Sequence, residues 1–340
     1  MTSERDFLRQ LQRRFPPRPP IVVGIGDDGA VLNTSAHEQQ VIVTDMLLDG
    51  VHFDLRQTSP RLAGRKAMAV NLSDLAAMAC RPTAAFVSLA IPRSPEDLDS
   101  FLMELYAGLA EFCESPNSSA ADAASDQPAP AGTASAATAP RAVSMGNFCI
   151  AGGDTNVWDG PFAVNVCLTG VPVIGQPVLR SGAKPGDVLV VTGPLGGSLK
   201  SGRHLMFTPR LDTAAKLVSQ FPVHAMMDIT DGLAIDLHRM LEAGCCGAVV
   251  NAALVPIHPD VPVELPAEER LHRALSDGED FELLLAIPAA CAASSEFQGV
   301  LKTLPGAAVI GTITDVPGHC SLRQPDGTVC KLEPQGWQHL

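Results

Sequence analysis

The sequence predicts an α/β protein of two domains, and three observations support this. Short apolar runs typical of strands alternate with longer segments of helical spacing along nearly the whole chain. The length of 340 residues suits two domains of ordinary size. After the apolar segment that ends in "LTGVPV", the stretch "LRSGAKPGD" indicates a linker and a turn before a new strand. We therefore expect domains over 1–174 and 175–340.

The first half of the chain contains three predicted helices and five predicted strands. The helices cover residues 3–14, 61–79 and 94–113, and the strands cover 21–26, 40–47, 84–92, 147–155 and 162–173. Arg81 and Pro82 stop the second helix, and Ser94 opens the third. The segment 115–142 is almost wholly Ala, Ser, Pro, Thr, Gly and Asp. Such a composition cannot bury a core, so we expect a disordered surface insertion there.

The second half continues the alternation of strands and helices. A strand follows the linker, and residues 226–244 begin extended and become a helix that Gly244 ends. Further strands are predicted over 248–255, 281–288 and 307–314, and further helices over 266–278 and 289–303. This order of elements is that of an α/β domain, and the chain has no long internal repeat.

Composition and charge exclude several classes of function. The chain has 24 basic and 37 acidic residues and a formal charge of −13, which repels nucleic acids and anionic membranes. Aromatic residues are only 4% of the chain, so a surface for stacking bases is not expected. Nine cysteines without a C-x-x-C pair indicate a reduced, cytoplasmic protein rather than a disulfide framework or a zinc site. The N-terminal segment is too charged for a signal peptide, and no apolar run has membrane-spanning length.

One glycine-rich stretch, "GIGDDGAVL", combines phosphate-binding spacing with acidic residues. Gly24, Gly26 and Gly29 have the G-x-G-x-x-G spacing of a dinucleotide-binding turn. That turn requires a following helix, whereas the residues after Gly29 are strand-like. In addition, Asp27 and Asp28 would face the negative pyrophosphate. A dinucleotide site is therefore disfavoured, and a tight β-turn with Gly at positive φ is the simplest alternative.

Acidic residues recur beside apolar segments throughout the chain, where an unpaired charge is costly. We expect Asp45 and Asp154 directly after strands and Asp74 within a helix. The pattern has six members: Asp28, Asp45, Asp74, Asp154, Asp228 and Asp231. Few Lys or Arg residues are close to them in sequence, so bound cations are the expected partners. Oxygen ligands without a His or Cys cluster select Mg²⁺, which accompanies nucleotide phosphates.

The metal interpretation depends on the whole pattern. Taken singly, each Asp is better explained as a helix cap or a turn residue. A P-loop is absent, because the chain contains no G-x-x-x-x-G-K-[ST] and "GPLGGSLKS" has the wrong spacing. Six acidic residues in one pattern favour a site in which carboxylates hold metal ions and the metal ions hold phosphates.

Nine motifs occur in an order that resembles a known family. They are "GIGDDGAVL", "VTDMLLDGVHF", "KAMAVNLSDLAAMACRP", "AGGDT", "LRSGAKPGD", "MMDITDGLAIDL", "ALSDGEDFELLL", "IGTIT" and the terminal "GWQHL". Together they resemble the thiamine-monophosphate kinases, whose superfamily includes aminoimidazole ribonucleotide synthetase and selenophosphate synthetase. The resemblance spans nearly the whole chain outside 115–142. It implies a homodimer whose N-terminal strands form a barrel across the two subunits. It also implies a C-terminal α/β domain of ferredoxin-like character, with the active site in the cleft between the domains.

The resemblance also implies an activity and a set of site residues. The family transfers the γ-phosphate of ATP, its co-substrate, to thiamine phosphate and forms thiamine diphosphate. The ligands of several Mg²⁺ ions would be Asp28, Thr44, Asp45, Asp74, Asp154, Asp228 and Asp231; nucleotide contacts would be Tyr106, Gly153, Asp154, Arg180 and Thr230; and thiamine phosphate contacts would be His52, Glu279 and Trp337. The acceptor phosphate is already ionised near neutral pH, so no general base is assigned. Arg180 would fork onto a phosphate, and Trp337 would cover the thiazolium or pyrimidine ring.

Departures from the family pattern leave the acceptor open. The segment 193–210 is shortened, Asp277 stands where the family usually has Gly, and Asn156 stands where Thr or Ser is common. Two alternatives therefore remain: a related ATP-dependent enzyme with a different acceptor, and a nucleotide-binding regulatory relative without turnover. Without the resemblance, ordinary structural roles would explain five of the implied residues: His52, Tyr106, Arg180, Glu279 and Trp337.

Overall fold

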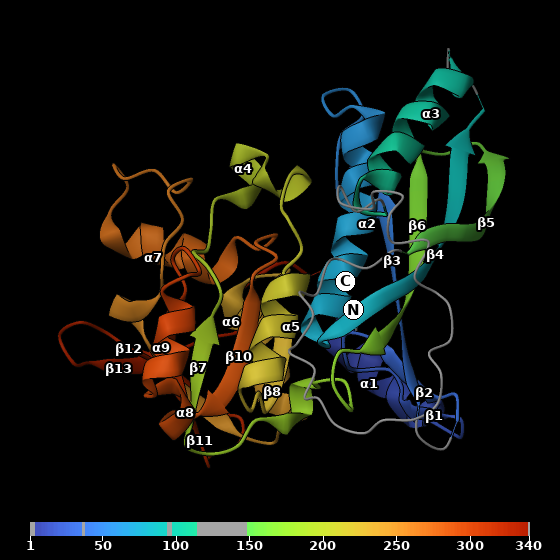
Figure 1. Ribbon diagram of the computed structural model, residues 1–340. Helices are drawn as coiled ribbons and strands as arrows, with labels where there is room; N and C mark the ends of the chain where they lie inside the picture. The colour runs from blue at the N-terminus through green and yellow to red at the C-terminus, as the bar shows by residue number, and fades with distance from the viewer. Residues whose placement is uncertain (1–3, 36–37, 94–96, 114–147, 339–340) are drawn as a thin grey trace.

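Two mixed β-sheets, one in each half of the chain, form the framework (Figure 1). The computed structural model describes residues 4–35, 38–93, 97–113 and 148–338. The predicted insertion 115–142 and the predicted helix start at Ser94 lie outside these residues. The first sheet has the strand order β1-β2-β3-β6-β4-β5, and the second has the order β13-β12-β9-β11-β7-β10-β8. The two-domain α/β architecture is therefore as predicted.

The first sheet is antiparallel except for its last pair of strands. Its strands are β1 (Ile21–Val23), β2 (Ala30–Asn33), β3 (Gln39–Leu48), β4 (Cys80–Pro92), β5 (Cys149–Trp158) and β6 (Ala163–Pro172), and only β4 and β5 pair in parallel. A strand, not a helix, follows Gly29, which excludes a dinucleotide-binding turn there. Asp45 and Asp154 lie inside β3 and β5, in agreement with the predicted strands 40–47 and 147–155, and not directly after a strand as we also expected. A strand accommodates such residues because successive side chains point to opposite faces.

Helix α2 (Pro60–Ala77) is the central helix, and it contacts β3 and β6 of the first sheet and β8 of the second. Ser59 caps its N-terminus by accepting a hydrogen bond from the Leu62 N–H at 3.3 Å, with Pro60 next in sequence. Most of its own residues are small or apolar, and the buried ones occur on all sides of the helix, as is typical of a buried helix. At Gly64, a Cβ would lie 2.1 Å from the carbonyl oxygen of Leu105. Only Gly at this position therefore allows α3 (Leu98–Leu109) to approach so closely.

The remaining helices of the first half agree with the prediction except at one end. Helix α1 (Glu4–Arg14) lies where it was expected. Helix α3 is capped by Asp97, whose side chain accepts a hydrogen bond from the Ser100 N–H at 3.0 Å. A short 3₁₀ turn, η1 (Ala110–Phe112), extends α3.

The second sheet is also mainly antiparallel. Its strands are β7 (Asp187–Val191), β8 (Ala225–Asp228), β9 (Gly247–Asn251), β10 (Leu283–Pro288), β11 (Ala308–Thr314), β12 (Cys320–Arg323) and β13 (Val329–Lys331), and only β9 and β12 pair in parallel. Its helices are α4 (Ser198–Ser201), α5 (Leu211–Gln220), α6 (Leu233–Ala243), α7 (Ala267–Ser276), α8 (Ala289–Ala292) and α9 (Ser295–Leu301), with 3₁₀ turns η3 (Arg180–Gly182), η4 (Arg203–Leu205) and η5 (Ala252–Leu254). The predicted helix over 289–303 is broken in two, because Ser294 caps α9 by accepting from the Phe297 N–H at 3.2 Å.

Two hydrophobic clusters lie on opposite faces of the second sheet. The first cluster also contains the core around α2 and includes Leu283 and Leu285 of β10, so the two halves share one apolar interior. The second cluster includes Leu284 of β10 and Leu237 of α6. The alternation along β10 follows from the strand period of two. Because of the shared interior, α2 brings side chains of the first half against the second half.

The outer face of the first sheet is open in the part of the chain that the structure describes. Thr44 and Met46 of β3 and Phe86 of β4 are exposed there, whereas the alternate residues Val43 and Val87 are buried. Among the described residues, no helix has both the length and the apolar character needed to cross a bilayer.

Candidate active site

Three carboxylates from distant parts of the sequence meet between the two sheets. Asp28 lies in the loop between β1 and β2, Asp74 in the last turns of α2, and Asp228 at the end of β8. One oxygen from each of the three lies within 4.8 Å of the others. The Asp28 side chain is fully buried and Asp228 is 2% exposed. Ser73 donates a hydrogen bond to Asp228 Oδ2 at 2.5 Å and so links α2 to β8.

Burial and mutual repulsion destabilise the ionised forms of these acids. Burial, together with neighbouring carboxylates, holds the pKa of Asp74 and that of Asp228 well above the usual range. Burial also raises the pKa of Asp45, which shares a hydrogen bond with Asp74, to about 6. A set of closely spaced oxygen ligands with raised pKa values is the arrangement that a hard cation stabilises.

The expectation that few basic residues accompany the acidic pattern was wrong. Arg180, in η3 directly after the linker, donates to Asp28 with Nε at 2.9 Å and also with Nη2. Its backbone N–H donates to Asp27 Oδ2 at 3.2 Å. Burial alone would lower the pKa of Arg180, but Asp28 and Asp27 keep it above its usual value. The sequence alone did not indicate this ion pair, because its two residues are 152 positions apart.

A second arginine supports the loop that follows β8. Arg239 Nη1 contacts Asp231 Oδ2 at 2.5 Å and Asp236 Oδ1 at 2.6 Å. Asp236, buried in α6, also accepts hydrogen bonds from the backbone N–H groups of residues 230, 231 and 232. This carboxylate therefore fixes the loop that carries Thr230 and Asp231. Sequence reasoning missed both Asp236 and Arg239; their helical spacing of three residues was the available signal.

The structure does not bring every predicted ligand to the carboxylate cluster. Thr44 precedes Asp45 on a strand and points to the outer face, where its Oγ1 contacts Asn165 Oδ1 at 3.3 Å. Asp154 is exposed on the edge strand β5, and its side chain accepts from the Thr155 N–H at 2.9 Å. Two adjacent strand residues cannot point their side chains to one site, which explains the separation of Thr44 from Asp45.

The predicted nucleotide contacts also divide between two places. Arg180 and Thr230 lie beside the carboxylates, as described above. Tyr106 is half-buried on α3 and packs against the apolar core, and Gly153 lies on β5 beside Asp154. A Cβ at Gly153 would lie 1.7 Å from the carbonyl oxygen of Val87, so β4 and β5 require Gly at this point.

Two of the three predicted acceptor contacts, His52 and Glu279, meet at Lys66, which the sequence did not reveal. Lys66 Nζ donates to the His52 carbonyl oxygen at 2.8 Å and to Glu279 Oε2 at 2.5 Å, and it lies 2.9 Å from His204 Nδ1. Burial alone would raise the pKa of Glu279, but the contacts with His204 and Lys66 lower it. Trp337 is 53% exposed, and its backbone N–H donates to the Asp231 carbonyl oxygen at 2.9 Å.

The two departures on the acceptor side are in direct contact. Asp277 accepts a hydrogen bond from the Gly197 N–H at 3.0 Å. Arg203, from the same shortened segment, contacts Asp280 Oδ1 at 2.9 Å, and Arg210 contacts Glu282 Oε2 at 2.9 Å. Segment 193–210 and the "DGEDFE" motif therefore form one unit, in which residues of the segment contact successive acids of the motif.

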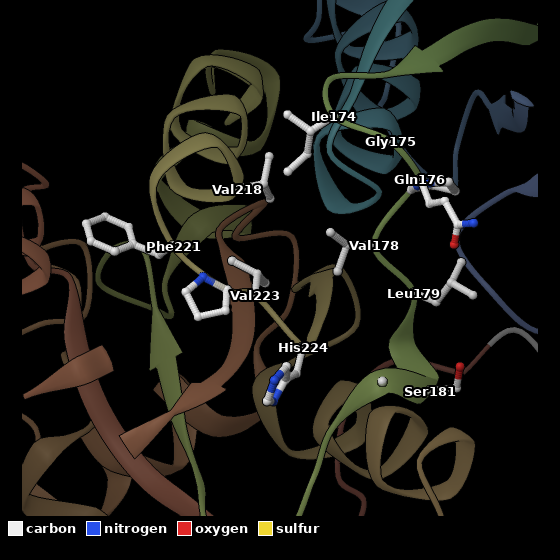
Figure 2. Close-up of a pocket in the computed structure, with 13 residues that line it drawn as sticks. Ile174, Gly175, Gln176, Val178, Leu179, Ser181, Val218, Phe221, Val223 and His224 are labelled. Atoms are coloured by element: carbon white, nitrogen blue, oxygen red, sulfur yellow. The ribbon is translucent and has the colours of Figure 1, made fainter. Parts of the chain in front are cut away.

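A groove of about 510 Å³ lies between the linker and the turn after α5 (Figure 2). Val178 and Leu179 of the linker lie on one side of it, and Val218 and Val223 lie on the other. His224 lines the groove and immediately precedes β8, whereas Asp228 ends that strand. The groove therefore lies at the opposite end of β8 from the carboxylate cluster.

Comparisons with known proteins find similarity along the whole chain. Residues 26–172 match the family model for the N-terminal domain of AIR synthase related proteins, and residues 184–320 match the model for the C-terminal domain. A thiamine-monophosphate kinase of Rhodopirellula baltica is 36% identical over 99% of this chain and 97% of its own. The one from Bacillus subtilis is 29% identical over 99% of both chains.

Solved structures are similar over the same extent. One is described as AaThiL complexed with AMPPCP and TMP; it has a TM-score of 0.75 and 25% identity over 99% of this chain and 97% of its own. The thiamine-monophosphate kinase of Stenotrophomonas maltophilia K279a has a TM-score of 0.66 and 28% identity over 96% of both chains.

Proposed function

The chain belongs to the thiamine-monophosphate kinase family, and from this premise we propose that it transfers the γ-phosphate of ATP to thiamine phosphate and forms thiamine diphosphate. The convergence of Asp28, Asp74 and Asp228 between the two sheets is the observation that carries the proposal. A structural relative is described with both AMPPCP and TMP bound, which supports one site for a nucleotide and an acceptor. The chain matches such relatives over nearly its whole length, including the segments of all three carboxylates.

The metal part of the proposal assigns Mg²⁺ to the carboxylate cluster. Asp28, Asp74 and Asp228 would hold the ions, with Asp45 and Asp231 close enough in the fold to complete the set. The donors fit because they are all oxygens, and because burial raises the pKa of three of them: Asp45, Asp74 and Asp228. Bound Mg²⁺ would neutralise the phosphate groups of ATP and of the acceptor. The side chains of Thr44 and Asp154 lie away from the cluster. Their assignment as metal ligands therefore rests on the family resemblance alone.

The residues of the chain act mainly by positioning and charge. Phosphoryl transfer passes through a loose transition state, for which alignment and neutralisation dominate. Arg180 supplies a fixed positive charge beside Asp28, and the loop held by Asp236 presents Thr230 and Asp231. The acceptor phosphate is ionised near neutral pH, so no residue is needed as a general base. His52 and Glu279, which contact Lys66, and Trp337, which contacts the Asp231 main chain, are proposed to bind the acceptor.

We propose a homodimer in which the outer faces of two first sheets form a barrel. The exposed apolar residues on the outer face of this sheet support it, since Met46 is 58% exposed and Phe86 42%. Such a dimer would cover β5 and so enclose Gly153 and Asp154 of the proposed nucleotide site. Tyr106 on α3 belongs to the same half of the chain.

Three further parts of the prediction stay as proposals. A domain boundary at 174/175 is supported by the gap between β6, which ends at Pro172, and β7, which begins at Asp187. The ferredoxin-like character of the second domain is supported by its layer of helices on a largely antiparallel sheet. A cytoplasmic location rests on the cysteine content of the sequence.

A product assay tests the proposed function directly. Purified protein with ATP, Mg²⁺ and thiamine phosphate is expected to form thiamine diphosphate, detected by chromatography. Chelation with EDTA should stop the reaction, and excess Mg²⁺ should restore it. If ATP is bound or consumed but no thiamine diphosphate appears, the chain acts on a different acceptor. If ATP is bound without turnover under any acceptor tested, the regulatory alternative holds.

A further inference from the structure

Lys66 is a buried lysine with a complete set of hydrogen-bond acceptors. It lies in α2 between Arg65 and Ala67, and it is 1% exposed. An ammonium group has three N–H donors. Three acceptors surround it: the His52 carbonyl oxygen at 2.8 Å, Glu279 Oε2 at 2.5 Å and His204 Nδ1 at 2.9 Å. The Lys66 ammonium group therefore has an acceptor for each of its protons when His204 Nδ1 carries none.

The partners of Lys66 come from three segments that the proposed function places at the acceptor. His52 follows β3, Glu279 precedes β10, and His204 belongs to the shortened segment 193–210. We propose that Lys66 is a positioning residue for the acceptor, holding the Glu279 carboxylate and the main chain at His52 in one arrangement, with His204 as its third contact. This proposal rests on the proposed function.

The main chain at Glu279 has an unusual conformation that neighbouring residues hold in place. Glu279 has φ 57° and Phe281 has φ 53°, both in the left-handed region that a non-glycine residue adopts only at a cost in free energy. The Glu279 N–H donates to the Thr230 carbonyl oxygen at 2.6 Å, and the Phe281 ring stacks on Phe207 at 3.8 Å between centroids. These contacts fix the main chain, and Lys66 fixes the carboxylate.

Lys66 acts through Glu279 rather than on the reacting phosphates. Asp74 is eight residues further along α2, which corresponds to about 12 Å along the helix axis at 1.5 Å per residue. Lys66 is enclosed by its three partners, whereas the Glu279 side chain is 22% exposed. The Glu279 carboxylate, which is partly exposed, is therefore the group that reaches a ligand, and the lysine sets its direction. Loss of Lys66 should weaken acceptor binding and leave ATP binding intact.

Steady-state kinetics of Lys66→Met test this selectivity. We expect the KM for thiamine phosphate to rise at least tenfold, while the KM for ATP and kcat at saturating acceptor change less than about threefold. Lys66→Arg should lower the KM for thiamine phosphate part of the way towards the wild-type value. It restores the positive charge, but a planar guanidinium group meets the three acceptors in a different geometry from an ammonium group. Lys216→Met, on the exposed side of α5, is the matched control and should behave as wild type.

A second variant separates positioning from folding, because Lys66→Met leaves a largely buried carboxylate without its cation. The double variant Lys66→Met/Glu279→Gln removes that charge. Its melting temperature should exceed that of Lys66→Met, and its KM for thiamine phosphate should stay at least tenfold raised. An unchanged acceptor KM in Lys66→Met, or an equal rise in both KM values, overturns the positioning role while the proposed function stands. Absence of thiamine diphosphate from the wild-type protein overturns both.

Discussion

At the scale of single residues, the carboxylates of the acidic cluster repel one another, and one arginine offsets part of their negative charge. Asp28, Asp74 and Asp228 converge within 4.8 Å, and the one guanidinium described in contact with them, Arg180, binds Asp28 alone. Asp74 and Asp228 keep raised pKa values, caused first by burial. The side chains are therefore placed for a ligand that carries positive charge. Of the two carboxylates in the glycine-rich turn, Asp28 belongs to this cluster, whereas Asp27 accepts hydrogen bonds from the backbone N–H groups of Asp28 and Arg180.

Asp45 provides the sharpest residue-scale test of metal binding. Asp45→Asn keeps the side-chain shape but removes the charge that a cation would meet, so turnover should fall by about 100-fold or more. The melting temperature of the metal-free protein should stay the same or rise, because a buried charge with a pKa of about 6 is removed. Asp212→Asn, on the exposed side of α5, is the control. Unchanged turnover in Asp45→Asn would contradict the metal assignment.

The raised pKa of Asp45 also predicts how Mg²⁺ binding depends on pH. Burial raises this pKa from 3.8 to about 6, so below pH 6 a proton occupies the group and competes with the metal. In the absence of metal, a carboxyl with a raised pKa contributes stability at low pH and loses it as pH rises through about 6. The increase in melting temperature on adding Mg²⁺ should therefore be larger at pH 7.5 than at pH 5.5. An increase that is equal at both values would be contrary to this coupling.

At the scale of elements, the packing of α2 decides where the site forms. This helix carries Lys66, Ser73 and Asp74. It contacts both sheets, so these side chains meet groups of the second half. Its close approach to α3 depends on Gly64, whose hypothetical Cβ lies 2.1 Å from a backbone oxygen. A backbone oxygen within two packed helices cannot move aside as a flexible side chain can.

Two glycine substitutions should therefore have opposite effects on stability. Gly64→Ala should destabilise the protein by about 2 kcal/mol or more, because overpacking between two helices has no cheap relief. Gly299→Ala, inside α9 and with open space at its Cβ position, should stabilise by about 0.5–1 kcal/mol through higher helix propensity. Urea unfolding measures both free energies. A Gly64→Ala protein as stable as wild type would disprove the close packing of α2 and α3.

At the scale of the whole molecule, the open face of the first sheet exposes apolar residues that the proposed dimer would cover. It exposes Met46 and Phe86 beside polar residues such as Thr44, whereas the opposite face is packed against α2. The edge strand β5 is exposed along its length. A second copy of the chain would cover both features, as the barrel of the family resemblance implies.

The dimer can be tested by surface charge. Phe86→Glu should convert a dimer into a monomer, because two copies of the charge would be buried in a symmetric interface. Multi-angle light scattering after size exclusion measures the mass in solution. Val263→Glu, at a residue 70% exposed in the second half, is the control and should remain dimeric. A wild-type protein that is monomeric at micromolar concentration would remove the barrel proposal.

The local parts of the fold were predictable because they depend on neighbouring residues. The spacing of apolar residues predicted α2, α6 and most strands. Helix α5 was missed although Leu211, Ala214 and Val218 have the spacing of a buried face. The strand-like residues after Gly29 correctly indicated that no dinucleotide-binding turn is present. Errors occurred at ends of elements, where a cap such as Asp97 or Ser294 decides the boundary.

The sequence by itself determined the α/β class, the acidic motifs and the family resemblance, since each is written in short runs of residues. Only the tertiary structure decided which carboxylates meet, that Thr44 faces away from Asp45, and that Arg180 neutralises Asp28. It alone also revealed Lys66 joined to His204 and Glu279, which are 138 and 213 positions away. The reason is geometric: contacts of this range depend on how α2 packs between two sheets, and no local pattern encodes the distance between side chains that chain connectivity leaves far apart.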